Sequence, residues 1–233
     1  GLMKTYSSKA IEDYLLDETA SQVEISSLEV NLPDGVDVDL LISALEEFYG
    51  DAYIDIESKE LFDIVEILGL TLNDAEMTVL SSAILELSLT TNFSIHETHY
   101  NPVISTEYNL DNYPFFGRNT KVNKIVGNSF SIYNPNESGY MFKVEKVDSD
   151  SVRLILVGLP FVDTIEASKA ETEIAYISQF TDNDEYLQTG REGMIIVVNR
   201  TITDLYNNEV YNKDIIFEFY PPVTEITLEP IPE

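Results

Sequence analysis

The spacing of apolar residues predicts helices in the first 90 residues of the chain. Between residues 40 and 48 apolar side chains recur every three or four positions, and Gly50 follows as a helix-terminating residue. A clearer helix is expected after Asn73, because Glu76 stands three residues later in the arrangement of a capping box. Two shorter helices are also expected, at residues 11–15 and within residues 58–69.

The period of the pattern changes to two from about residue 93, where β-branched and aromatic residues alternate with polar ones. Three such alternations predict a β meander, at residues 130–132, 140–144 and 152–156. The apolar run at residues 194–198 predicts a hairpin with residues 210–220, because the Asn-Asn pair at 207–208 suits a tight turn. A last strand is expected at residues 223–228, after two prolines break the preceding one.

These patterns together predict an α+β fold, in which a helix-rich N-terminal part precedes an antiparallel β meander and a β-rich C-terminal module. The chain has 233 residues, of which 44% are hydrophobic, so it can form one or two packed domains. No apolar run approaches the ~20 residues of a membrane span. Residues 1–3 look like a remnant before an internal start, which leaves room for a leader or an anchor upstream.

Acidic residues greatly outnumber basic ones, and this limits the partners of the protein. The 42 Asp and Glu residues exceed the 13 Lys and Arg residues, and the formal net charge is −29. Nucleic acids and anionic membranes are both bound by clustered Lys and Arg, so we expect the chain to be repelled by them. Neutral or cationic partners remain.

The residue types and motifs exclude several kinds of chemistry. The absence of cysteine removes disulfides, thiolate metal sites and a cysteine nucleophile. His96 and His99 are three residues apart in an expected strand or loop, whereas zinc enzymes of the helical type need a spacing of four, so no metal site is expected. The acidic clusters lack the glycine and glutamate of a calcium-binding loop. No nucleotide-binding glycine motif occurs, and no cofactor is expected.

Aromatic residues are abundant, with 14 Tyr and 11 Phe, and several of them stand near expected turns. A flat ring can stack on the apolar face of a sugar, and a neutral glycan is not repelled by the negative charge. This composition favours carbohydrate binding, although tyrosine is also an ordinary strand residue.

Five segments follow one another in a recognisable order, at residues 40–62, 77–85, 93–103, 117–122 and 129–134. Their order resembles that of the VanW-like family of cell-surface proteins of Gram-positive bacteria. The tail of the chain is similar to the G-five-type β module, which often follows in that family and is linked to cell-wall glycan binding. The tail segments are residues 190–194, 199–201 and 220–223.

This resemblance implies a degenerate, non-catalytic member of the family. Met77 stands where relatives have a cysteine, and a thioether cannot act as a thiolate. The resemblance places His99 and Arg118 in the remnant site, and it suggests that Arg200 and Tyr220 mark an exposed strand face of the tail. Purely structural roles stay open for each: Arg118 as a turn residue, Arg200 paired with an acid, and Tyr220 in the core.

We therefore expect three parts: a helical or extended segment at residues 1–35, a VanW-like domain at 36–160 and a G-five-like module at 161–233. The leading hypothesis is a non-catalytic extracellular protein that binds cell-wall glycan or a surface partner of a Gram-positive bacterium. One alternative is a cell-wall hydrolase or transferase that uses carboxylates and His99, which requires convergent acids in a deep cleft. The other is an acidic module that recognises a protein of the envelope.

Overall fold

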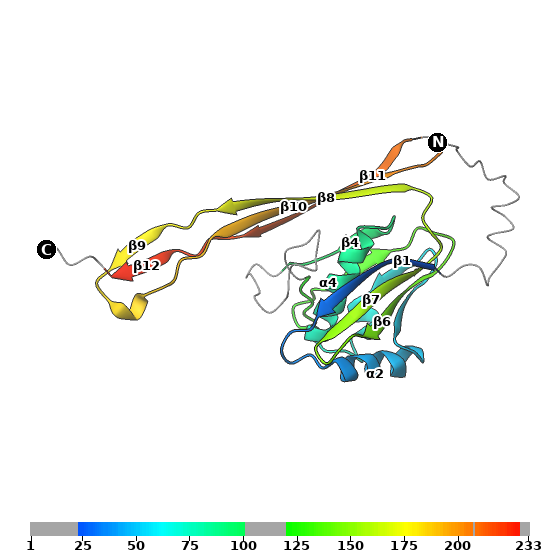
Figure 1. Cartoon of the computed structure of the whole chain (residues 1–233), viewed down its shortest axis with the longest axis horizontal. Coiled ribbons are helices and arrows are strands. Elements are labelled where there is room, and N and C mark those ends of the chain that lie inside the picture. Colours follow the sequence, from blue (N-terminus) through cyan, green and yellow to red (C-terminus); the bar gives the residue numbers. More distant parts are fainter. Residues whose placement is uncertain (1–22, 101–119, 207, 229–233) are drawn as a thin grey trace, which may run out of the picture.

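The fold is taken from a computed structural model that describes residues 23–100, 120–206 and 208–228, without the side chains of residues 211–215. The described residues form two parts, shown in Figure 1: a packed body at residues 23–158 and a long β arm at residues 164–228. The arm lies across one side of the body and projects well beyond it.

The main sheet of the body is antiparallel and has four strands. Its spatial order is β1 (Val23–Asn31), β7 (Ser151–Gly158), β6 (Tyr140–Lys146) and β2 (Tyr53–Ile56). Alternate residues of β6 are buried up to Val144, and every residue of β7 except Arg153 is buried. The register places Phe142 opposite Leu156 and Val144 opposite Leu154. These pairs contribute one apolar face to the core.

A second antiparallel sheet and three α-helices complete the body. The sheet has the order β3 (Leu61–Asp63), β5 (Ser131–Tyr133) and β4 (Ser94–Glu97), and the helices are α2 (Val38–Tyr49), α3 (Ile64–Leu68) and α4 (Asp74–Ser88). Helix α2 begins where Asp37 accepts hydrogen bonds from two backbone N–H groups, and it ends at Gly50, whose φ is 85°.

Helix α4 is the centre of the body, because every residue from Met77 to Ser88 is buried. Asn73 and Glu76 form the capping box that begins this helix. Two hydroxyl groups attach a distant segment to it: Ser82 accepts from the backbone N–H of residue 120 at 2.8 Å, and Thr78 accepts from that of residue 122 at 3.0 Å.

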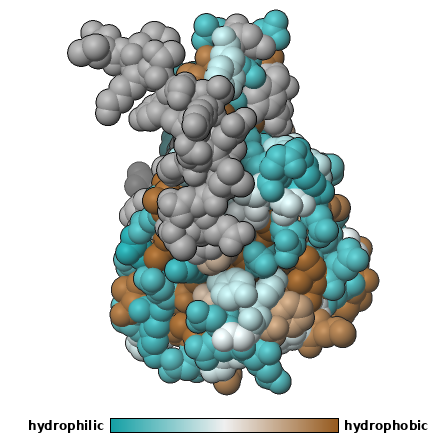
Figure 2. Space-filling view, turned by 90° about the vertical axis from the view of Figure 1, so that its right-hand side faces the viewer, coloured by the Kyte–Doolittle hydropathy of each residue, from teal (hydrophilic) through white to brown (hydrophobic). Residues whose placement is uncertain are grey.

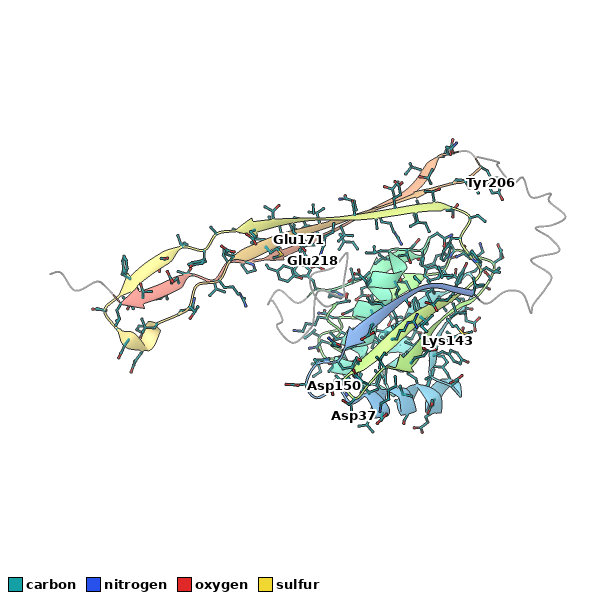
Figure 3. All side chains as sticks on the ribbon, in the orientation of Figure 1. Asp37, Lys143, Asp150, Glu171, Tyr206 and Glu218 are labelled. Atoms are coloured by element: carbon teal, nitrogen blue, oxygen red, sulfur yellow. The ribbon has the colours of Figure 1, made fainter. Side chains whose placement is uncertain are left out.

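The arm begins as a three-stranded antiparallel sheet. Its order is β11 (Val210–Tyr220), β10 (Gly193–Thr203) and β8 (Thr164–Ile174), so β10 is central. Even-numbered residues of β10 face the body, and Ile196, Val198 and Ile202 are fully or almost fully buried there. The hairpin end of β10 and β11 lies near Tyr206, and Glu171 and Glu218 mark the middle of the arm in Figure 3.

Towards its tip the arm changes strand order. Strand β12 (Glu225–Leu228) pairs in parallel with β9 (Ser178–Thr181) on one side. On the other side Gln188 forms an isolated bridge with Ile226 of β12, and Arg191 forms one with Val223 just before it. Since β11 continues into β12, this chain segment crosses from the outside of β10 to the middle of the tip. The crossing is tight at Gly193, where an added Cβ would lie 2.5 Å from the backbone of residues 220 and 222. A short 3₁₀ turn, η2 (Asp184–Tyr186), leads the chain back from the tip.

Several predicted elements are confirmed. The helices expected at residues 40–48 and after Asn73 are α2 and α4, and the hairpin of residues 194–198 with 210–220 is β10 with β11. The last strand is β12, and the helix expected within residues 58–69 is the shorter α3. The helix expected at residues 11–15 lies outside the described residues.

The predicted helix-rich N-terminal part is wrong. Up to residue 97 the structure has the four strands β1, β2, β3 and β4 besides its helices, and strands dominate the described chain. The short apolar alternations at residues 23–31 and 53–56 span too few positions to separate a period of two from one of 3.6. The predicted meander is correct only for β6 and β7, because β5 pairs with β3 and β4 in the other sheet. The division at residues 35 and 160 stays a prediction.

Within the described residues, none of the helices combines the length and the apolar character that a membrane crossing requires.

Candidate functional site

Arg200 is a fully buried residue that joins the arm to the body. It lies on β10, and its guanidinium donates to the backbone oxygens of Ser88 at 2.8 Å, Thr91 at 3.1 Å and Phe93 at 2.7 Å. Ser88 is the last residue of α4, whose final turn contains no basic residue of its own. The positive charge of Arg200 therefore stabilises the negative end of this helix dipole.

Tyr220 and Glu218 are buried beside this attachment. The Tyr220 hydroxyl donates to Glu218 Oε2 at 2.6 Å, and the Tyr220 ring contacts that of Tyr100 edge to face. The exposed fraction is 0% for Tyr220 and 4% for Glu218. Both residues thus belong to the interface between arm and body.

The expectation that Arg200 and Tyr220 mark an exposed strand face is wrong. Arg200 has the same parity along β10 as Ile196 and Val198, which face the body, and Tyr220 pairs with Met194 on that same face. The spacing in the sequence places Arg200 on the same face as Ile196 and Val198, because residues two apart in a strand share a face, but it does not specify which face is buried.

His99 lies at the surface of the body, next to Glu97. Its Nε2 is 2.7 Å from Glu97 Oε1, and the same oxygen accepts the backbone N–H of Ser129 at 3.1 Å. The hydrogen bond from His99, and then that from Ser129, hold the pKa of Glu97 below its ordinary value. Arg118, the proposed companion of His99, lies outside the described residues.

The acids near His99 have structural partners. Asp63 accepts the Ser129 hydroxyl at 2.6 Å and also caps α3 by accepting two backbone N–H groups. Ser129 is therefore hydrogen-bonded to Asp63 rather than to the imidazole, which is unlike the order of a catalytic triad. Across the described ranges, no group of three or more His, Asp and Glu residues is placed to hold a metal ion.

The outward side of the arm sheet presents a different feature, an apolar face that nothing in the described chain covers. We call it the outer face, and its residues are Ile195, Val197, Phe217 and Phe219. The register places Ile195 beside Phe219 and Val197 beside Phe217, so the four side chains are adjacent. Phe217 is 56% exposed and Phe219 is 40% exposed.

Strand β11 thus inverts the usual distribution of side chains in a sheet that packs on a body. The acid Glu218 is buried against the body, while the two phenylalanines on either side of it point to solvent. Exposed charges and buried rings are the usual arrangement in a protein, so the reverse arrangement indicates an interaction surface. On the body face seen in Figure 2, by contrast, apolar residues are interspersed with hydrophilic ones.

The tip of the arm is also apolar and open. Its large exposed side chains are Tyr176, Ile177, Phe180, Tyr186, Leu187 and Leu228. A shallow hollow of about 420 Å³ lies between residues 187–189 and 225–228.

Sequence reasoning missed the outer face and the tip. Alternation in residues 215–220 predicts a strand correctly, but the pattern alone favours burial of Phe217 and Phe219 and exposure of Glu218. The structure shows the reverse, so only the packing of the arm on the body reveals these residues.

Comparisons with known proteins do not assign the chain to a family. No protein-family model, no curated protein and no solved structure matches it. The resemblance to VanW-like proteins therefore stays a prediction.

Proposed function

We propose that this protein is a non-catalytic interaction module that binds a partner protein through its arm. The observation that carries the proposal is the inversion in β11, which buries Glu218 and leaves Phe217 and Phe219 on the uncovered outer face. Burying a phenylalanine side chain contributes about 1.5–3 kcal/mol. A partner that covers the outer face would gain about half of this contribution for each ring, because Phe217 is 56% and Phe219 40% exposed.

The charge of the chain defines the chemistry of that partner. With a net charge of −29, a second acidic protein is repelled at long range, whereas a basic protein is attracted. The partner proposed is a protein with an apolar patch surrounded by Lys and Arg. Its association should be fast at low salt and slower as salt is added.

The setting of this module, the surface of a Gram-positive cell, is a proposal that rests on the VanW-like resemblance alone. Wall glycan is the second candidate ligand, because Tyr176, Phe180 and Tyr186 present exposed rings at the tip. Phe180 lies on β9 and Tyr186 in η2, at the tip of the arm in Figure 1, whereas the outer face lies on β10 and β11, so the two candidates predict different sensitive residues.

Site-specific photo-cross-linking in the source cells tests the partner proposal. A photoreactive phenylalanine replaces Phe217, and the matched control carries it at Ile125, a body residue that is 93% exposed. We expect one dominant basic protein to be linked at position 217 and not at position 125. Equal adducts at both positions would contradict the proposal.

Co-sedimentation with purified peptidoglycan tests the second candidate. Loss of retention in Tyr186→Ala, but not in Tyr206→Ala at the opposite end of the arm, would support glycan binding. Released fragments that disappear in His99→Ala would instead support the hydrolase alternative.

A further inference from the structure

Within the described residues, one margin of the arm has no strand partner along its length. Among the described strands, β8 pairs only with β10 and β9 pairs only with β12, so the other side of β8 and β9 is open. This margin runs from the body to the tip as one continuous stretch of chain, as Figure 1 shows. An open margin presents backbone N–H and C=O groups that another strand can pair with.

Charge protects the first part of this margin but not the second. Strand β8 carries Glu166, Lys169, Glu171 and Glu173, which discourage pairing with another chain. Residues 175–181 carry no charge and no proline, and Ile177 and Phe180 are 66% and 63% exposed. An uncharged, exposed edge of this kind is open to pairing with another strand.

The backbone direction at this edge follows from one hydrogen bond. The carbonyl oxygen of Ile177 accepts from Glu225 N at 2.9 Å, so the backbone groups of Ile177 face β12. Successive residues of a strand direct these groups to opposite sides. The N–H and C=O groups of Ser178 and Phe180 therefore face the open margin.

The sheet at the tip is too small to cover its own apolar side chains. Its one parallel pair, β9 with β12, is only four residues long, and residues 188–191 add isolated bridges on one side. Parallel pairs are normally covered on both faces, and small sheets have little stability alone. A further strand beside β9 would pair the open backbone groups and cover Ile177 and Phe180.

Charge identifies the occupant of this edge. Glu173 stands at one end of the uncharged stretch, and Asp182, Asp184 and Glu185 stand at the other. A second copy of the chain would place the same carboxylates against them, which destabilises a strand pair. A strand with an apolar middle and with Lys or Arg at its ends is complementary.

We propose that residues 175–181 form a docking edge, which accepts an extended segment of the partner protein as an added β-strand, apolar in its middle and basic at its ends. This inference rests on the proposed function and adds to it the mode of binding.

The test uses a labelled synthetic peptide, Lys-Lys-Val-Thr-Val-Thr-Val-Lys-Lys, and the full chain. The control peptide replaces both threonines with proline, which keeps the charge but prevents pairing as a strand. Ser178→Pro removes an outward N–H and is compatible with an edge strand. Ser178→Ala is its matched control, because both variants lose the 2.5 Å hydrogen bond from the Ser178 hydroxyl to Glu225.

We expect the first peptide to bind to wild type and to Ser178→Ala at least tenfold more tightly than to Ser178→Pro. The proline peptide should bind to wild type and to Ser178→Ala at least tenfold more weakly than the first peptide does, and the two peptides should bind equally weakly to Ser178→Pro. On the wild-type chain, the first peptide should slow hydrogen exchange at Ser178 and Phe180 but not along β8. This measurement does not depend on the folding of any variant.

Equal binding of the two peptides, or unchanged exchange at Ser178 and Phe180, would overturn the docking edge. Self-association of the chain that Ser178→Pro abolishes would overturn the choice of a basic partner in favour of a second copy. A failure here, with specific cross-linking at position 217, would leave the proposed function standing. If the peptide binds as expected but position 217 gives no specific cross-link, the docking edge would stand and the role of the outer face would be contradicted.

Discussion

Replacing Arg200 with methionine should detach the arm from the end of α4. The guanidinium donates three buried hydrogen bonds, to Ser88, Thr91 and Phe93, and methionine makes none of them. The Ser88 oxygen retains a hydrogen bond from Thr91 N at 3.1 Å, so the loss falls mainly on the other two carbonyls.

The expected cost follows from these contacts. A hydrogen bond to a charged group contributes ~1.5–3 kcal/mol, so two of them give about 3–6 kcal/mol. Removing the charge also removes its desolvation penalty, and the methionine side chain fills part of the space. We therefore expect the free energy of unfolding to fall by about 3 kcal/mol, a large share of the 5–15 kcal/mol typical of a protein.

Urea unfolding followed by circular dichroism measures this change, and hydrogen exchange at residues 88–93 shows whether the loss is located at the attachment. Arg153→Met is the matched control, because Arg153 makes two hydrogen bonds from a half-exposed position, to Glu24 and Ser27. An exposed ion pair contributes at most about 1 kcal/mol. A fall for Arg200→Met no larger than that for Arg153→Met would refute the reasoning.

Three further predictions concern other parts of the fold. Asn73→Ala should lower the free energy of unfolding by ~1 kcal/mol, because it removes the cap of α4; no change in urea would exclude the capping box. Gly193→Ala should cost about 1–3 kcal/mol, because the new Cβ meets backbone atoms that cannot move aside; a neutral result in the same assay would contradict the strand crossing. The pKa of Glu97 lies below its ordinary value of 4.5, so its ionised form stabilises the fold above that pH, and the contribution disappears as pH falls through the lowered pKa. Glu97→Gln should therefore destabilise more at pH 7 than at pH 3, and an equal effect at both would argue against the bond to His99.

The sequence predicted those elements that are stabilised by residues close to one another along the chain. Asn73 and Glu76 predict the start of α4, because the two members of a capping box are three residues apart. The hairpin of β10 and β11 was predictable because both strands are long and a turn lies between them. Such elements depend little on the rest of the fold.

The exposed and buried faces of the arm could not be predicted, because they are defined by distant contacts. Strand β8 has small and charged residues such as Ala167, Lys169 and Ala170, which give a weak strand pattern. The burial of Arg200 depends on carbonyls more than 100 residues earlier in the chain. Likewise, the exposure of Phe217 depends on which side of the sheet packs on the body, and alternation alone does not specify that side.

The central claim is that the outer face binds a basic partner protein. Its most direct test is the dissociation constant for the partner linked at position 217, measured with wild type and with the double variant Phe217→Ser, Phe219→Ser. Loss of about 2 kcal/mol of apolar burial predicts a dissociation constant about thirtyfold higher for the double variant. The control, Leu70→Ser with Ile125→Ser, changes two exposed residues of the body and should bind as wild type does. Equal affinities for the double variant and the control would contradict the account.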